Sequence, residues 1–418
     1  MIVLYNSGLI NIKYYDMVKD MAKTKKDSNF SSDEKSTSTT KIKVIGIGGG
    51  GCSIVSEIST NLKKVDFVAA NTDKRALREL SKKTKVFNFG EKITGGFGTG
   101  MNFDLGKSSA QDDKERIKSL FKGQDMCILV ASLGGGTGSG AVPVFAKIAK
   151  DMGLITYGIF TLPFEFEGSR KMDIANEALK EVKSHLNAIT VLPNENIFKV
   201  IDKKTPLKEA LSIINKNFQE SLEGLIETIY NPGLINIDFA DLKTILGERG
   251  KLAYLNTTLF DANKSIDDII KKATLNPFYS YTINGASSVL FNITGGENLG
   301  LKDVSLISEG ILNLTGKNSK VIFGISKDTK YKDKVRIMIL AVGCESENVL
   351  PEVKKEVVSK NVVEESKSEP KRKKESKKVE VEVRRNALET KKAVEEIERE
   401  IINKDDQWET PAFLRRNK

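Results

Sequence analysis

The sequence predicts an α/β protein of two domains that are joined by one long central helix, with disordered extensions at both termini. Three observations support this prediction. From Lys41 onward, short β-prone runs alternate with helix-like runs; after Thr205 a long apolar stripe has helical period; and both ends carry Lys-, Ser- or Glu-rich segments. Alternating strands and helices are typical of parallel sheets with right-handed crossovers.

The N-terminal extension, residues 1–40, ends in the segment KTKKDSNFSSDEKSTSTTK. Such a segment cannot bury enough apolar surface to fold, so we expect it to be disordered. The apolar start MIVLYNSGLI has no basic region before it and no small-residue cleavage site after it, which argues against a secretory signal.

The first domain, residues 41–206, is expected to be Rossmann-like. Its predicted strands are KIKVIGI, DFVAANT, MCILVASL, LITYGIF and AITVLP, and its predicted helices include CSIVSEISTNL and AVPVFAKIAKDM. The central helix follows at residues 207–230 and ends at Asn231-Pro232-Gly233, where proline lacks a donor and glycine permits a turn. Its apolar stripe consists of Leu207, Leu211, Ile214, Phe218, Leu222, Leu225 and Ile229.

The second, smaller α/β domain is predicted at residues 231–343, with strands at SSVLFNIT, SKVIFGIS and VRIMILAVG. Residues 344–405 have the composition of a charged, disordered linker. The chain then ends with residues 406–418, DQWETPAFLRRNK, in which aromatic residues reappear after a long absence. We expect this last segment to be a binding peptide on a flexible tether.

Composition narrows the function classes. Hydrophobic residues make up 39% and charged residues 29% of the 418 residues, as in ordinary globular proteins. No apolar run is long enough to span a bilayer, and the three cysteines lack ligand-like spacing. The single His185 excludes histidine-dependent triads. The net charge is +10, and lysine-rich runs such as KTKKD and KRKKESKK lie in the extensions; we interpret these runs as solvated tails and not as a nucleic-acid surface. We therefore expect a cytoplasmic protein.

A first glycine-rich loop, Gly46–Ser53, lies between the strand KIKVI and a helix. Glycines there permit positive φ and a close approach of backbone N–H groups to phosphates at a helix N-terminus. By itself this signal is weak, because dinucleotide-binding folds use a similar loop. A tight strand–helix turn is the structural alternative, although such a turn rarely needs four consecutive glycines.

A second loop, GGGTGSG at Gly134–Gly140, lies between another strand and another helix. Its backbone donors and hydroxyls are suited to a polyanion. It lacks the Lys-Ser/Thr ending of a P-loop, and no GxGxxG with an acidic ribose partner is present. The segment Thr94–Asn102, which includes Gly98, could close over a terminal phosphate. Together these loops predict a nucleoside triphosphate site.

At this point the sequence resembles a known family. GGGTGSG is the tubulin-family signature, and PFEFEG, NPGLINIDFADL and the terminal PAFLRR occur in the order and spacing of the FtsZ branch of that family. The resemblance extends from Lys41 to about Gly343. It implies a GTP-binding domain at 41–206 and GTP and GDP as ligands.

The resemblance also implies site residues. One implied set binds phosphates: Gly49, Gly50, Gly51, Cys52, Ser53, Gly98, Gly134, Gly135, Gly136, Thr137 and Gly138. Another lies on the ribose and base side: Glu167, Lys171, Asn194, Asn215 and Lys216. No residue is expected to be a resident metal ligand, although Mg²⁺ is expected with the nucleotide.

Asp238 and Asp241 match the paired carboxylates of a loop that one subunit inserts into the nucleotide site of its neighbour. Carboxylates can orient a water and help to place a cation. Helix N-capping is the structural alternative. We expect capping to explain one aspartate but hardly both, together with Asn236.

The chain departs from the family pattern near the base and the phosphates. Cys52 and Ser53 stand where glycine and asparagine are usual, and Lys171 replaces an arginine. Lys216 stands where an aspartate accepts hydrogen bonds from guanine, and Leu211 where an aromatic ring stacks on the base. Because lysine cannot accept those bonds, we expect weakened guanine selectivity.

The resemblance therefore implies a GTPase active on polymerisation, which forms head-to-tail filaments with itself and acts in cell division at mid-cell. The C-terminal peptide would bind a membrane-tethering adaptor, so that membrane contact is indirect. Two alternatives remain open. A tubulin-like filament for DNA segregation would not need the terminal PAFLRR, and a regulatory homologue without turnover would not need both aspartates.

Overall fold

The structure is a computed structural model that describes residues 40–345, apart from residues 61, 63, 203, 262–263 and 297–298. The predicted N-terminal extension, except for Thr40, lies outside the described residues. The predicted linker beyond residue 345 and the C-terminal peptide also lie outside them.

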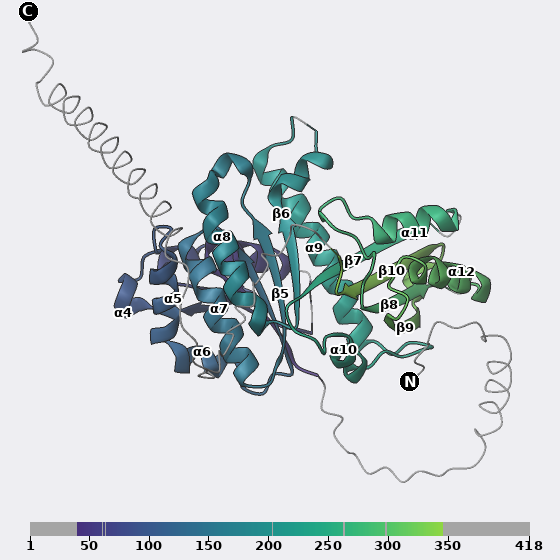
Figure 1. Cartoon of the computed structure of the whole chain (residues 1–418), viewed down its shortest axis with the longest axis horizontal. Coiled ribbons are helices and arrows are strands. Elements are labelled where there is room, and N and C mark those ends of the chain that lie inside the picture. The colour runs from purple at the N-terminus through teal and green to yellow at the C-terminus, as the bar shows by residue number, and fades with distance from the viewer. Residues whose placement is uncertain are drawn as a thin grey trace, which may run out of the picture. The chain divides into compact units, whose positions relative to one another are not determined.

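A single sheet of ten strands forms the centre of the described part, in the order β3-β2-β1-β4-β5-β6-β7-β10-β8-β9 (Figure 1). All neighbours from β3 to β7 are parallel, β10 is antiparallel to both β7 and β8, and β9 is parallel to β8. The strands are β1 (Ile42–Ile47), β2 (Asp66–Asn71), β3 (Lys85–Asn88), β4 (Met126–Ser132), β5 (Ile155–Leu162), β6 (Ala188–Pro193), β7 (Lys251–Asp261), β8 (Ser288–Gly295), β9 (Lys320–Lys327) and β10 (Lys334–Val342).

Helices cover both faces of the parallel part of the sheet. On one face α5, α6 and α8 pack against α7, and these four helices lie in front of the strands in Figure 1. The helices α2 and α9 form a separate pair that contact each other. The helices are α2 (Gly48–Ile58), α3 (Lys74–Arg78), α4 (Glu91–Thr94), α5 (Phe103–Asp112), α6 (Lys114–Phe121), α7 (Gly136–Asp151), α8 (Ser169–Val182), α9 (Leu207–Tyr230), α10 (Phe239–Ile245), α11 (Ile266–Thr274) and α12 (Leu301–Leu312). Short 3₁₀ helices occupy Glu165–Glu167, Lys183–His185, Asn194–Lys199 and Thr329–Tyr331.

The core explains why the central strands are apolar almost without interruption. In β4 every residue from Met126 to Ala131 is buried, because helices lie on both faces of the sheet. The strand β1 is buried in the same way, apart from Lys43. Two adjacent strands of this kind provide a rigid support for the loops that follow them.

The long helix predicted from the apolar stripe is present as α9, Leu207–Tyr230. From Ile214 onward the stripe packs inward, with Ile214, Phe218, Leu222 and Leu225 all buried, whereas Leu207 and Leu211 in its first two turns are exposed. At Gly224 an added Cβ would lie less than 3.0 Å from Thr257 of β7. The absence of a side chain therefore lets α9 approach the second half of the sheet.

The two halves of the sheet meet at a narrow junction between β6 and β7. The register joins only Ala188 with Lys251 and Ile189 with Leu252. Buried hydroxyls reinforce the junction, since Thr190 donates to the Ala253 carbonyl at 2.7 Å and Tyr281 donates to the same carbonyl at 2.8 Å. The halves are thus joined by a short ladder and by side chains that cross it.

Candidate functional site

Both predicted glycine loops lie at the point where the strand order reverses. The strands β1 and β4 are parallel neighbours, with Ile47 in register with Ala131. From β1 the chain moves to β2 on one side, whereas from β4 it moves to β5 on the other. In open α/β sheets, ligands bind beyond the carboxyl ends of the strands at such a switch point.

The two loops touch each other there. Gly48 has φ of +75°, and an added Cβ on it would lie 2.7 Å from the Gly138 backbone nitrogen. Only glycine tolerates both that conformation and that approach. The N-termini of α2 and α7, which begin at Gly48 and Gly136, are therefore brought side by side.

The glycines divide into a packed group and an open group. An added Cβ on the packed glycines would meet backbone or fixed side-chain atoms, whereas no atom lies within 4 Å of an added Cβ on the open ones. The packed glycines are Gly50, Gly51, Gly136 and Gly138, and the open ones are Gly49, Gly98 and Gly135. Some of these glycines are thus needed for close packing, and others leave space in which a phosphate could bind. The sequence alone does not distinguish the two groups.

Thr137 connects the second loop with two other segments. Its hydroxyl shares a hydrogen bond of 3.0 Å with Thr72, after β2, and one of 3.2 Å with Thr99. Ser139 accepts a hydrogen bond of 2.9 Å from the Gly134 N–H. The predicted third loop, which contains Gly98 and Thr99, is therefore held beside the signature loop.

Cys52 and Ser53 point in different directions. The Cys52 thiol is buried and donates to the carbonyls of Gly46 and Ala70 at 3.5 and 3.3 Å. Burial raises the pKa of this thiol to about 12, so that it stays protonated. Its side chain belongs to the core, and only its backbone is left for a ligand. Ser53 is exposed, and its hydroxyl donates to the Gly49 carbonyl at 3.1 Å.

Glu167 and Lys171 form an ion pair of 2.7 Å beside the second loop. Burial acts to raise the pKa of Glu167, but the hydrogen bonds from the Lys171 ammonium and the Phe164 N–H outweigh it and lower the pKa. An added Cβ on Gly134 would lie 3.0 Å from the Lys171 carbonyl. Lys171 of this pair therefore lies directly against the glycine loop.

Asn194 begins a 3₁₀ helix after β6. Its neighbour Glu195 accepts a hydrogen bond of 3.1 Å from the Glu165 N–H. The segment that carries Asn194 is thereby held against the turn that carries Glu167.

Further along α2, Asn215 of α9 contacts Glu57, a residue that is not among the predicted site residues. Its amide donates to Glu57 at 2.7 Å, and the Ser212 hydroxyl donates to the other oxygen of Glu57 at 2.5 Å. Glu57 and Lys216 are both exposed. The four-residue spacing Gly49, Ser53, Glu57 was the available signal, since such residues share one face of a helix.

Asp238 and Asp241 form a reciprocal capping box at the start of α10. The Asp241 N–H donates to Asp238 at 2.8 Å, and the Asp238 N–H donates to Asp241 at 3.0 Å. Asn236 accepts from the Gly233 N–H at 2.5 Å. The expectation that capping would hardly involve both aspartates was therefore wrong, because D-x-x-D satisfies two orphan donors at once.

The aspartates are not brought to the glycine loops of their own chain. The helix α10 packs against β8 and β9, and five strand spacings separate β8 from β4, or about 24 Å.

Within the described residues no group of three or more His, Cys, Asp or Glu side chains could hold a metal ion. Among the described helices, none has the length and apolar character that crossing a bilayer requires.

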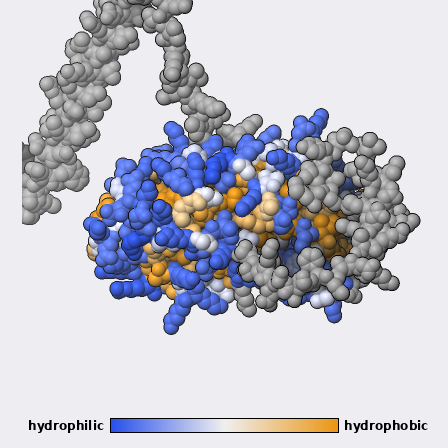
Figure 2. Space-filling view, turned by 90° about the horizontal axis from the view of Figure 1, so that it is seen from below, coloured by the Kyte–Doolittle hydropathy of each residue, from blue (hydrophilic) through white to orange (hydrophobic). Residues whose placement is uncertain are grey.

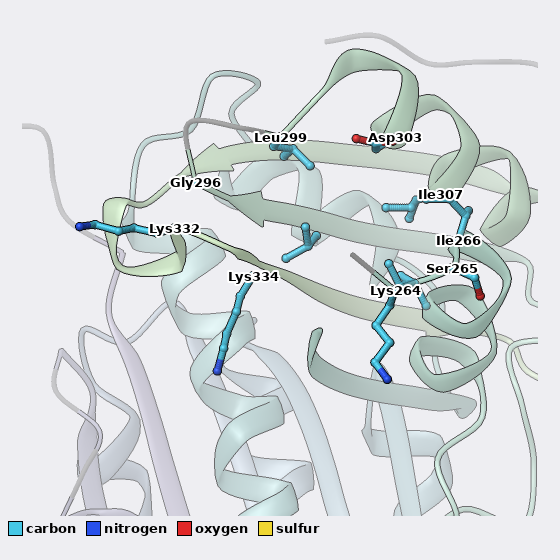
Figure 3. Close-up of a pocket in the computed structure, with 11 residues that line it drawn as sticks. Lys264, Ser265, Ile266, Gly296, Leu299, Asp303, Ile307, Lys332 and Lys334 are labelled. Carbon is cyan, nitrogen blue, oxygen red and sulfur yellow. The ribbon is translucent and has the colours of Figure 1, made fainter. Parts of the chain in front are cut away.

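A separate cavity of about 280 Å³ lies in the second half, between α11, α12 and β10. Figure 3 shows Leu299, Ile266 and Ile307 around it, while the ammonium ends of Lys264, Lys332 and Lys334 point away from it. Its walls combine apolar with charged side chains, and its lysines do not converge on one point, so it lacks the convergent donors of the predicted phosphate site.

Comparison with known proteins gives two family matches. Residues 41–202 match the family described as Tubulin/FtsZ family, GTPase domain, and residues 253–345 match FtsZ family, C-terminal domain. The Cell division protein FtsZ of Wigglesworthia glossinidia brevipalpis is 35% identical over 309 residues, 73% of this chain and 80% of that protein. That of Buchnera aphidicola subsp. Baizongia pistaciae is 36% identical over 304 residues, 72% of this chain and 78% of that protein.

Solved structures give the same result. An empty FtsZ dimer from M. jannaschii superposes with a TM-score of 0.65 at 30% identity, covering 80% of this chain and 93% of that chain. CetZ2 from Haloferax volcanii, solved as a GTPgS-bound protofilament, has a TM-score of 0.63 at 23% identity over 74% of this chain and 95% of that chain; it shows the shared fold. The predicted fold class is confirmed, and the chain is a member of the FtsZ family, with a tubulin-like GTPase domain followed by the FtsZ C-terminal domain.

Proposed function

We propose that this protein binds GTP across its two glycine loops and hydrolyses it in filaments of its own chain. The observation that carries the proposal is the contact of Gly48 with Gly138 at the switch point between β1 and β4. It aligns two helix N-termini, whose backbone N–H groups and dipoles favour a polyanion. The space around Gly49, Gly98 and Gly135 is open to receive it.

The remaining predicted nucleotide residues fit around such a polyanion. Thr137 of the signature loop shares a hydrogen bond with Thr99 of the loop that contains Gly98, where it would meet the terminal phosphates. Glu167 is held ionised by Lys171, so its carboxylate would accept ribose hydroxyl donors. Asn194 would serve the sugar side, and Asn215 would face the base.

Hydrolysis is proposed to occur at the joint between two subunits. Asp238 and Asp241 lie too far from the glycine loops of their own chain to act there, as the sheet order implies. Each carboxylate uses one oxygen in the capping box, which leaves the other to orient a water in the site of a neighbouring subunit. Assembly would thus complete the active site.

Mg²⁺ is part of the proposal only in combination with the nucleotide. This ion keeps several waters and uses one or two carboxylates plus substrate phosphates, and this mode fits a chain whose described residues offer no three-ligand cluster. Asp238 and Asp241 of the neighbouring chain would be the residues nearest to it. When bound, it would neutralise charge on the phosphates.

Exposed apolar side chains support head-to-tail assembly. Phe166, which is 71% exposed, stacks on Phe164 at 4.9 Å beside the nucleotide-side turn, and Phe198 is 57% exposed next to them. On the loop that precedes Asp238, Leu234 is 75% exposed. Figure 2 likewise shows hydrophobic residues among hydrophilic ones on one face of the described surface. A heterologous contact between two such different surfaces would build filaments.

The finer biological role is proposed from the family. We infer a division-ring protein that acts at the mid-cell membrane, with a cytoplasmic body and an adaptor bound by residues 406–418. The domain limits proposed with it are 41–206, 207–230 and 231–343. No direct contact with nucleic acid or lipid is part of this proposal.

Sedimentation with parallel measurement of phosphate release, comparing GTP, ATP and GDP, tests the proposal. We expect GTP to support both sedimentation and phosphate release, with a turnover per chain that rises with protein concentration. A turnover per chain that is independent of concentration would contradict catalysis at a subunit joint.

A further inference from the structure

We propose that Glu57 reads the base of the bound nucleotide and makes the site selective for guanine. The inference rests on the proposed function, in which the triphosphate lies against the two glycine loops. It goes beyond that function by assigning selectivity to a side chain on α2, in place of the residue at position 216. It also replaces the weakened guanine selectivity that Lys216 alone would imply.

The position of Glu57 follows from the geometry of α2. Gly49, Ser53 and Glu57 are four residues apart and therefore share one face of the helix. Gly49 borders open space, and Ser53 and Glu57 are exposed. Eight residues at a rise of about 1.5 Å each place Glu57 about 12 Å from Gly49 along the axis. A nucleotide held by its phosphates at Gly49 and extended along this face would carry its base toward Glu57.

The contacts of Glu57 orient its carboxylate toward α9. Ser212 donates to Oε1 at 2.5 Å and Asn215 donates to Oε2 at 2.7 Å. An ionised carboxylate has about four acceptor sites, so each oxygen can accept a second hydrogen bond. The two helices thus hold a pair of parallel acceptors in place before a ligand arrives.

Paired acceptors match guanine and not adenine. The pairing edge of guanine presents two adjacent donors, the N1–H and the exocyclic amine at C2, and one carboxylate can accept from both. Adenine presents an acceptor at N1 and a C–H at C2, which would leave the carboxylate unpaired. Lys216 is a donor only, so it cannot perform this discrimination, whereas Glu57 supplies the acceptors that position 216 lacks.

The test is displacement of a fluorescent GTP analogue from the full chain by GTP, ATP and XTP. Xanthine carries a carbonyl oxygen at C2 in place of the amine, and Glu57→Gln places an amide that can accept from N1–H and donate to that oxygen. We expect wild type to prefer GTP over both competitors. In Glu57→Gln we expect the ratio of GTP to XTP affinity to fall about ten- to hundredfold.

Glu79→Gln is the matched control, because it removes the same charge from an exposed site after α3; its GTP-to-XTP ratio should equal that of wild type. Glu57→Asp keeps the carboxylate and should retain the guanine preference. It provides a second test if the Gln variant is unstable. A uniform loss of all three nucleotides in Glu57→Gln, or an unchanged ratio, would overturn the assignment and leave Glu57 a tie between α2 and α9. Failure of wild type to bind any nucleotide would instead refute the proposed function itself.

Discussion

Asp238 and Asp241 each hold the backbone of the other: the Asp241 carboxylate accepts the Asp238 N–H at 3.0 Å, and the Asp238 carboxylate accepts the Asp241 N–H at 2.8 Å. One oxygen of each side chain is therefore committed to starting α10. The other oxygen of each side chain is the one proposed to orient a water in the site of a neighbouring subunit. The contribution of the pair to helix capping and its contribution to hydrolysis must therefore be separated by experiment.

Asp238→Asn separates them. Asparagine caps a helix about as well as aspartate, but it lacks the charge that orients a water. We expect this variant to unfold at the wild-type temperature, to bind GTP normally, and to release phosphate about a hundredfold more slowly. Asp238→Ala and Asp241→Ala should lose the same turnover and in addition about 0.5–2 kcal/mol of stability, and their filaments should persist longer.

Catalysis in trans gives a further readout of the same variant. A chain that cannot bind nucleotide still presents its aspartates, so mixing it with Asp238→Asn should restore part of the phosphate release. Full turnover by Asp238→Asn alone would contradict a catalytic role for this carboxylate.

Two neighbouring glycines should respond differently to alanine. At Gly136 an added Cβ would lie less than 3.0 Å from Thr99 and Asn102, whereas at Gly135 it would meet no atom within 4 Å. We therefore expect Gly136→Ala to cost about 1–3 kcal/mol of stability. Gly135→Ala should remain within about 0.5 kcal/mol of wild type and should weaken nucleotide binding by occupying ligand space.

Thermal unfolding and titration with a fluorescent GTP analogue measure the two effects. Gly49→Ala is a second open-site variant and should behave like Gly135→Ala. Normal nucleotide affinity in both open-site variants would argue against phosphate binding at these loops.

The Glu167–Lys171 pair predicts a small dependence of stability on pH. The pKa of Glu167 is lowered in the folded state, so ionised Glu167 stabilises the fold. This contribution is complete above the ordinary glutamate pKa of about 4.3 and is lost as the pH falls through the folded-state value. Because the pair is partly exposed, it is worth at most about 1 kcal/mol.

Lys171→Met should therefore have a lower melting temperature than wild type at neutral pH. The difference between the two melting temperatures should become smaller in acid. Lys180→Met, an exposed lysine on the same helix, is the control and should leave the pH profile unchanged. A gap between Lys171→Met and wild type that widens in acid would contradict the assigned direction.

Deletion of residues 406–418 tests the proposed tether. Trp408, Phe413 and Leu414 lie near two arginines in this segment, a composition suited to a short peptide whose many copies along a filament gain avidity. We expect the purified truncation to assemble and hydrolyse GTP normally. In cells its filaments should leave the membrane; membrane-attached rings that survive the deletion would exclude the tether.

The parts of the fold that could be predicted are those in which the pattern is local. The apolar stripe of α9 needs only its own period, and the glycine runs mark the strand ends that they follow. By contrast, β7 was not predicted, because its central residues are buried polar side chains. Asn256, for example, donates to the Ala273 carbonyl at 2.9 Å, and a partner 17 residues away leaves no trace in the periodicity of a strand.

The same limit applies to the site. In the sequence Glu57 is an exposed acid with no distinguishing feature, because the residues that donate to it, Ser212 and Asn215, are 155 and 158 residues away. The packed and open glycines were also indistinguishable, since the difference lies in Thr99 and Ser132 across the loop. Asp241 is different, because its capping role has a local signature, the D-x-x-D spacing at the start of a helix.

In mechanical terms, the junction of β6 and β7 is the weakest connection between neighbouring strands of the sheet. Its ladder joins two residue pairs, whereas β10 and β7 are joined along their whole length from Lys334 with Asp261 to Val342 with Ala253. Under a pulling force that reaches the sheet, the junction should part first, and each half would keep its own hydrogen bonds. A filament built from such subunits would then yield inside its monomers as well as between them, and stretching single chains in an optical trap would show this as an early, small extension before either half unfolds.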